Sequence, residues 1–94
     1  MKSQNGGNLP LGQLQISEKV NQSVRPFEIV HAIRCHKRKT WGNMQDKQRK
    51  RANSLLAKIG AQVRSEFKSS TGVQFWIITS KKRDITRVLL PREY

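Results

Sequence analysis

Three side chains that can bind metals or act as nucleophiles lie close together in the sequence: His31, Cys35 and His36. His31 and Cys35 would share one face of a helix, because residues four apart lie one above the other. Zinc needs about four such ligands, whereas the chain has one cysteine and two histidines in all. No motif indicates an activated Cys–His nucleophile. We therefore expect no metal and no cofactor, with Cys35 buried as a small apolar side chain and the histidines on the surface.

The carboxylates show no arrangement suited to catalysis. Acid–base chemistry and Mg²⁺ binding commonly use carboxylates that lie close together, and the six acidic residues are spread singly along the chain. Asp46 suits the first turn of a helix, and Asp84 suits a turn. The pattern favours a protein that is not an enzyme, and it gives a small nuclease no support. The acids are Glu18, Glu28, Asp46, Glu66, Asp84 and Glu93.

Positive charge dominates the composition. Lysine and arginine number 19 against 6 aspartate and glutamate residues, which gives a net charge of +13. Such an excess attracts polyanions, and nucleic acid is the partner we expect. Residues 34–51 hold eight cations against one acid, and a second basic turn follows at residues 81–83. The candidate nucleic-acid-binding residues are Arg34, Lys37, Arg38, Lys39, Trp41, Lys47, Lys50, Arg51, Lys81, Lys82 and Arg83.

The two tryptophans allow a further kind of contact, because aromatic rings can stack on unpaired bases. Trp76 lies in the most apolar segment of the chain, so we expect it in the core. Trp41 adjoins the basic cluster, where it would either cover the core or contact the nucleic acid. The sequence leaves both roles of Trp41 open.

An alternative partner is an acidic protein. In that interpretation a sheet face left uncovered by helices, including Trp76 and Ile78, forms the contact surface. The single cysteine fits a reducing compartment, and the first eight residues lack the apolar run of a signal peptide. No apolar stretch approaches the length of a membrane span. We therefore expect a cytoplasmic protein that does not bind a membrane.

Two helices are expected to position the basic residues. The first begins at Pro26, since proline suits the first helical position, and carries Phe27, Val30 and Ile33 as its apolar stripe. The second extends from an N-cap at Asn43 to a stop at Gly60. On a helical wheel its apolar residues share the side expected to face the core, and its basic residues share another side. The apolar set is Met44, Ala52, Leu55, Leu56 and Ile59, and the basic set is Lys47, Lys50, Arg51 and Lys58.

After Gly60 the apolar pattern changes to a period of two, which is typical of strands. Strands are expected at residues 61–68, 73–79 and 85–90, where Pro91 ends the last one. The fold class expected is α+β, with two helices packed on a three-stranded antiparallel meander.

The segment before the first helix has a weaker pattern. Leu11, Leu14, Ile16 and Val20 can dock a short strand or turn onto the body, and Ser17 can cap a brief helical turn. Residues 1–10 are polar and glycine-rich, so a disordered arm is expected there. Residues 11–94 are expected to form a single basic domain.

The C-terminal residues 72–79, 83–86 and 89–94 resemble a family of small uncharacterised proteins from bacterial plasmids and integrative elements. That family ends roughly in W-I-I-T-x-x-D-R-x-x-T-x-x-L-L-P-x-E-Y, and Trp41-Gly42 matches its W-G feature. This chain is basic at Lys81-Lys82-Arg83, where family members are acidic. The resemblance implies a compact α+β domain of mobile-element origin and supplies no biochemical activity.

Charge and resemblance together predict a non-enzymatic nucleic-acid-binding protein that is an accessory or regulatory factor of a mobile element. The mobile-element setting favours DNA over RNA. The contacts expected are to backbone phosphates, because no base-reading motif is present.

Overall fold

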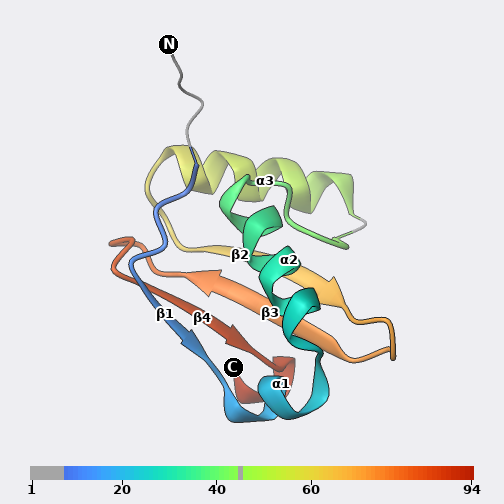
Figure 1. Ribbon diagram of the computed structural model, residues 1–94. Coiled ribbons are helices and arrows are strands. Elements are labelled where there is room, and N and C mark those ends of the chain that lie inside the picture. The colour runs from blue at the N-terminus through green and yellow to red at the C-terminus, as the bar shows by residue number, and fades with distance from the viewer. Residues whose placement is uncertain (1–7, 45) are drawn as a thin grey trace.

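The computed structural model describes residues 8–44 and 46–94. Most of the predicted arm at residues 1–10 lies outside the described residues. The described chain folds as α+β, with a four-stranded sheet in the order β1-β4-β3-β2 (Figure 1). None of its helices is long and apolar enough to cross a membrane. The elements are β1 Gln13–Ile16, α1 Glu18–Ser23, α2 Pro26–Lys37, α3 Lys47–Lys58, β2 Val63–Lys68, β3 Gln74–Thr79, β4 Ile85–Leu89 and a 3₁₀ turn η1 Pro91–Glu93.

The sheet is mixed, so the predicted three-stranded antiparallel meander is wrong. β2, β3 and β4 are antiparallel neighbours, with Ile77 opposite both Ser65 and Val88. β1 adds to β4 and runs parallel to it, with Ile16 opposite Val88. Parallel strands need a long connection, and here three helices and two strands intervene. β4 therefore lies inside the sheet.

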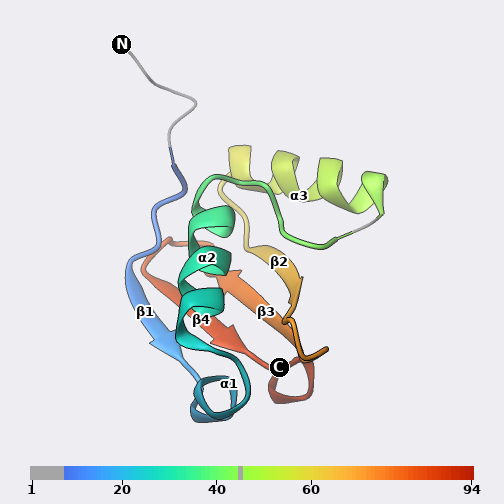
Figure 2. The same ribbon diagram turned by 45° about the vertical axis from the view of Figure 1, so that its right-hand side comes forward.

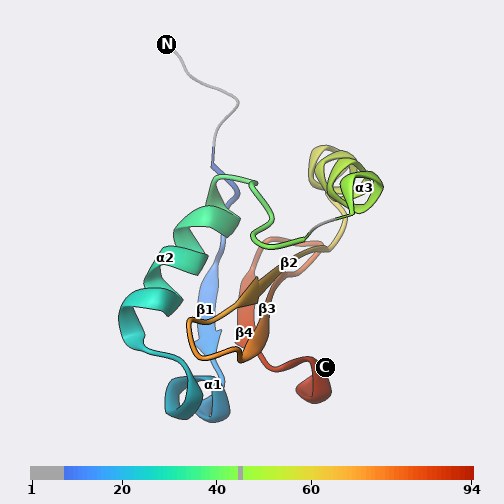
Figure 3. The same ribbon diagram turned by 90° about the vertical axis from the view of Figure 1, so that its right-hand side faces the viewer.

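α1 and α2 cover one face of the sheet (Figure 3). Ser17 caps α1 as predicted, because its hydroxyl oxygen accepts from the Val20 amide at 3.1 Å. The apolar side chains of these helices pack against those of the three longer strands, which removes apolar surface from water. This core consists of Val20, Val24, Ile29, Ala32, Phe67, Phe75, Ile77, Val88 and Leu90.

α2 begins at Pro26 as predicted, but the side that it buries differs from the predicted stripe. Phe27 and Val30 are exposed, at 66% and 50% of their surface. Ile29 and Ala32 face the core instead, and the buried side continues to the fully buried His36. The predicted stripe leaves out His36, and its centre lies about a third of a turn from the centre of the side that is buried.

α3 begins later than predicted. Its N-cap is Asp46, whose carboxylate accepts from the amides of Gln48 and Arg49. Asn43, the predicted N-cap, instead pairs with the outer edge of β2: its amide donates to the Glu66 carbonyl at 2.6 Å, and its side-chain oxygen accepts from the Lys68 amide at 3.0 Å. The helix ends at Lys58, just before Gly60.

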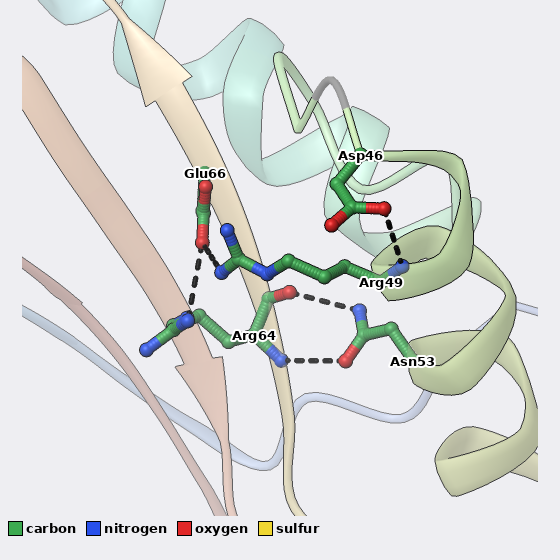
Figure 4. A network of polar contacts seen from close by, with 5 residues as sticks. All are labelled: Asp46, Arg49, Asn53, Arg64 and Glu66. Carbon is green, nitrogen blue, oxygen red and sulfur yellow. Dashed lines mark hydrogen bonds and ion pairs between the residues drawn. The ribbon is translucent and has the colours of Figure 1, made fainter.

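The side of α3 expected to face the core faces solvent. Leu55, Leu56 and Ile59 are 59%, 37% and 69% exposed. Met44 is buried, but it precedes the helix, and within α3 the one buried residue is Asn53. Asn53 donates to the Arg64 carbonyl at 2.8 Å and accepts from the Arg64 amide at 3.2 Å (Figure 4). α3 therefore docks mainly by polar contacts, because the edge strand β2 offers unpaired backbone groups to it, and Ala57 adds an apolar contact to the body.

Candidate nucleic-acid interface

The acidic side chains are used by the fold itself. Glu66 pairs with the guanidinium groups of Arg49 and Arg64 (Figure 4), and Asp46 caps α3. Glu28 accepts from the amide and hydroxyl of Ser70 at 2.7 and 3.0 Å. In residues 8–44 and 46–94, the only ion pairs are those of Glu66.

Two further carboxylates are held by hydrogen bonds. The Ser80 hydroxyl donates to Asp84 at 2.6 Å, which lowers the pKa of Asp84 and fits its predicted place in a turn. The Leu90 amide and the Ser17 hydroxyl both donate to Glu93 at 2.8 Å, and these bonds lower the pKa of Glu93. Both groups stay ionised at neutral pH, yet neither neutralises a basic side chain by direct contact.

Basic side chains gather between α3 and the loop that follows α2. A shallow hollow of about 500 Å³ lies there, and we call it the basic hollow. Four of its lining residues are cations and none is an acid. α3 and the loop after α2 lie at the same end of the molecule in Figure 1 and Figure 2, so Lys39 of the loop and the basic residues of α3 line one hollow. The lining residues are Lys39, Thr40, Trp41, Lys50, Arg51, Ser54, Leu55 and Lys58.

The loop that carries Lys39 has a fixed shape. Lys39 and Trp41 both have positive φ angles, of 65° and 64°, which non-glycine residues seldom adopt. The Thr40 amide and hydroxyl hold the loop by donating to the Cys35 carbonyl at 3.1 and 3.0 Å. Backbone strain of this kind, about 1–3 kcal/mol per residue, persists only where surrounding contacts enforce it.

Trp41 forms the floor of the basic hollow and is 2% exposed. Its indole N–H donates to the Ser54 hydroxyl oxygen at 2.9 Å, which ties the loop to α3. Leu9 and Val63 pack with it in a second small core. Of the two roles left open for Trp41, the structure therefore shows the core one, and we leave it out of the proposed contact residues.

His36 supports this loop from below, contrary to its predicted surface position. Its ring is fully buried, packs edge-on against Trp41 at 5.8 Å, and bonds Ser65 Oγ at 2.6 Å and Thr79 Oγ1 at 2.7 Å. Burial first, and then the positive charge of Arg83, lower the pKa of His36 to about 4. His36 is therefore neutral at physiological pH.

The other two metal-binding or nucleophilic side chains do not join His36. The His31 Nε2 atom lies 3.6 Å from Cys35 Sγ on α2, with His31 exposed and Cys35 half-buried. Across the part of the chain that the structure describes, no three His, Cys, Asp or Glu side chains form a cluster that could hold a metal ion.

The remaining predicted contact residues take different places. Arg34, Lys37 and Arg38 are exposed at the C-terminal end of α2, and Lys47 is exposed in the first turn of α3. Lys81 and Lys82 are exposed in the β3–β4 turn, outside the lining of the basic hollow.

Arg83 has a structural role. Its guanidinium donates to the carbonyl oxygens of Ala61 and Ser80 at 2.7 and 2.8 Å, and to that of Ala57 at 3.4 Å. These bonds fasten the β3–β4 turn to the C-terminal end of α3. The prediction from charge alone grouped Arg83 with its two lysine neighbours, although its side chain is turned inward.

Lys58 lines the basic hollow but was missing from the predicted contact residues. On a helical wheel it shares a side with Lys47, Lys50 and Arg51. The basic segment at 34–51 does not include it, because it lies seven residues further along the chain.

A second, more polar groove of about 570 Å³ lies over β2 and β3. Arg49, Arg64 and Lys68 contribute positive charge there, but Asp46 and Glu66 offset most of it. A phosphate entering this groove would meet two carboxylates. The basic hollow differs from this groove because no carboxylate lines it.

The sheet face away from α1 and α2 is not an open apolar surface. Ile78 is buried, at 6% exposed. The Arg64 guanidinium lies 4.1 Å from the centre of the Trp76 ring, and Tyr94 packs edge-on against it at 5.8 Å. The contact surface considered for an acidic protein partner is thus largely covered.

In comparisons with protein-family models, curated proteins and solved structures, the chain matches none.

Proposed function

We propose that this chain is a non-enzymatic nucleic-acid-binding protein that holds backbone phosphates in the basic hollow. The observation that carries the proposal is the meeting of Lys39, Lys50, Arg51 and Lys58 around one depression without an acidic neighbour. Five of the six carboxylates are held by hydrogen bonds or ion pairs elsewhere in the fold, and none of the six lines the hollow, so an external anion is needed to neutralise its cations.

Mutual repulsion makes anion binding favourable here. Like charges gathered around one depression repel one another, although water and salt weaken this repulsion at the surface. The four cations repel one another while the hollow is empty, and a phosphate placed among them is attracted to all four. Because the loop and α3 are fixed by Trp41 and Ser54, little ordering is needed on binding.

The geometry fits a repeated phosphate chain. Lys47 and Lys58 stand at the two ends of α3, and at 1.5 Å per residue they are about 16 Å apart along the helix axis. That length matches about five base-pair steps of duplex DNA at 3.4 Å per step. Contacts of this type hold the backbone without reading the sequence.

Duplex DNA is the nucleic acid favoured, because residues 72–94 resemble proteins of plasmids and integrative elements. We further propose that the chain acts in the cytoplasm as an accessory or regulatory factor of such an element. Lys81 and Lys82 extend the contact where the nucleic acid passes the C-terminal end of α3.

Fluorescence anisotropy tests this proposal, with labelled duplex DNA, single-stranded DNA and RNA of equal length titrated across a salt series. Neutralising five phosphates through Lys39, Lys47, Lys50, Arg51 and Lys58 predicts a slope of log K against log salt of about −4.5 on duplex DNA. EDTA should leave binding and the integrity of the DNA unchanged. Absence of saturable binding near 50 mM salt would refute the proposal.

A further inference from the structure

α3 carries a row of apolar side chains that the fold does not use. We call Ala52, Leu55, Leu56 and Ile59 the apolar stripe. Its three large members are 37–69% exposed, and Ala52 is exposed as well. Monomeric proteins rarely leave several large aliphatic side chains together in water, and such patches mark interaction sites.

The stripe is separate from the side by which α3 docks. The contacts to the body come from Arg49, Asn53, Ser54 and Ala57. On a helical wheel, the centre of the stripe lies roughly 110° from Asn53 at 100° per residue. Ala52 and Leu56 border the body, whereas substitutions at Leu55 and Ile59 leave these docking contacts intact.

Charge decides which partner suits the stripe. α3 contains five basic residues and no acid, and Lys47, Arg51 and Lys58 form a row along one border of the stripe. A second copy of the chain would bring two such rows together and be repelled. A helix with apolar residues on one face and carboxylates beside them would bury the stripe and neutralise the row.

We propose that the apolar stripe and its basic border bind an acidic amphipathic helix of a second protein. The apolar anchors would pack on Leu55, Leu56 and Ile59, and the partner's carboxylates would pair with Arg51 and Lys58. This mode of recognition uses anchors at helical spacing in the partner. It does not rest on the proposed nucleic-acid binding, but Arg51, Leu55 and Lys58 also line the basic hollow, so an acidic helix and a nucleic acid would compete for this side of α3.

The test uses a synthetic acidic peptide of about five helical turns, with leucines on one face and glutamates on both flanks. Its control is a scrambled peptide of identical composition, because any acidic peptide is attracted to so basic a protein. We expect wild-type protein to bind the amphipathic peptide at least about tenfold more tightly than the scrambled one. Equal affinity for the two peptides would overturn the proposal.

The matched variant is Leu55→Gln combined with Ile59→Gln. Its thermal unfolding should match that of wild type, because both side chains are exposed, and its affinity for the amphipathic peptide should fall to that of the scrambled one. Unchanged affinity would overturn the proposal. So would light scattering that shows a wild-type dimer and a monomeric variant, because a second copy would then cover the stripe.

Discussion

Acidification should destabilise the fold through His36. The ring is fully buried and both of its nitrogens are bonded, at 2.6 Å to Ser65 and 2.7 Å to Thr79. The Thr86 hydroxyl donates its single proton to the Leu11 carbonyl, so it must accept from the Thr79 hydroxyl. The Thr79 oxygen can then only accept from His36, which places the ring proton on Nε2. Ser65 then donates to Nδ1. This assignment follows from the hydrogen-bond network, and it satisfies a neutral imidazole completely.

The size and direction of the effect follow from the pKa of His36. That pKa falls from about 6.5 in the unfolded chain to about 4 in the folded protein. Between these values the unfolded chain binds a proton that the folded protein does not, so stability rises with pH. At 1.36 kcal/mol per pH unit, the fold should lose about 3 kcal/mol between pH 7 and pH 4 through this group.

Urea unfolding at a series of pH values measures this loss, with His36→Gln as the control. The variant should be less stable than wild type at pH 7, since glutamine replaces the ring imperfectly. Its stability should fall by about 3 kcal/mol less than that of wild type down to pH 4. Subtracting the pH dependence of the variant from that of wild type removes the contribution of the carboxylates, including Asp84 and Glu93, because both proteins contain them. Parallel pH curves for the two proteins would refute the role given to His36.

Three substitutions test other parts of the structure by thermal and urea unfolding. Asn53→Ala should lower the free energy of unfolding by about 2 kcal/mol, because it leaves the amide and carbonyl of Arg64 unpaired at a covered strand edge. A loss below about 0.5 kcal/mol would contradict polar docking of α3. Arg83→Met should lower the free energy of unfolding by about 1–3 kcal/mol, because the carbonyls that Arg83 bonds lose their donor. Unchanged stability would contradict this structural role and leave Arg83 as a candidate contact residue. Gly42→Ala should be more disruptive than either, because Gly42 has a φ of 65° and an added Cβ would meet the Glu66 carbonyl oxygen at 2.4 Å; wild-type stability would show that the loop is free to move.

The sequence predicts the three longer strands well, because side chains at every second residue face the same core. The start of α2 at Pro26 and the cap at Ser17 are confirmed as well. A short strand or a turn was expected near Leu14 and Ile16, but the parallel pairing of β1 with β4 was not predicted, because four residues carry little pattern and the partner strand lies about seventy positions away. Pairing between such distant segments depends on the whole fold.

The orientation of α3 could not be predicted from its own residues. A helical wheel assumes that the apolar side faces the core. Here the neighbour of α3 is an edge strand, so Asn53 faces inward and Leu55 faces solvent. The charge run did predict Lys39, Lys50 and Arg51 as neighbours, whereas the inward-facing side chains of Trp41 and Arg83 depend on contacts that charge does not reveal.

Binding of duplex DNA by two charge variants tests the central claim most directly. Lys50→Glu with Arg51→Glu changes the basic hollow, and Lys19→Glu with Arg25→Glu makes the same change in net charge around α1, at the opposite end of the molecule from α3 (Figure 1). We expect the first variant to bind at least about tenfold more weakly, with the salt slope reduced from about −4.5 to about −2.7, and the second to stay near wild type. Equal losses in both variants would show that net charge alone attracts DNA, and would contradict a phosphate site in the basic hollow.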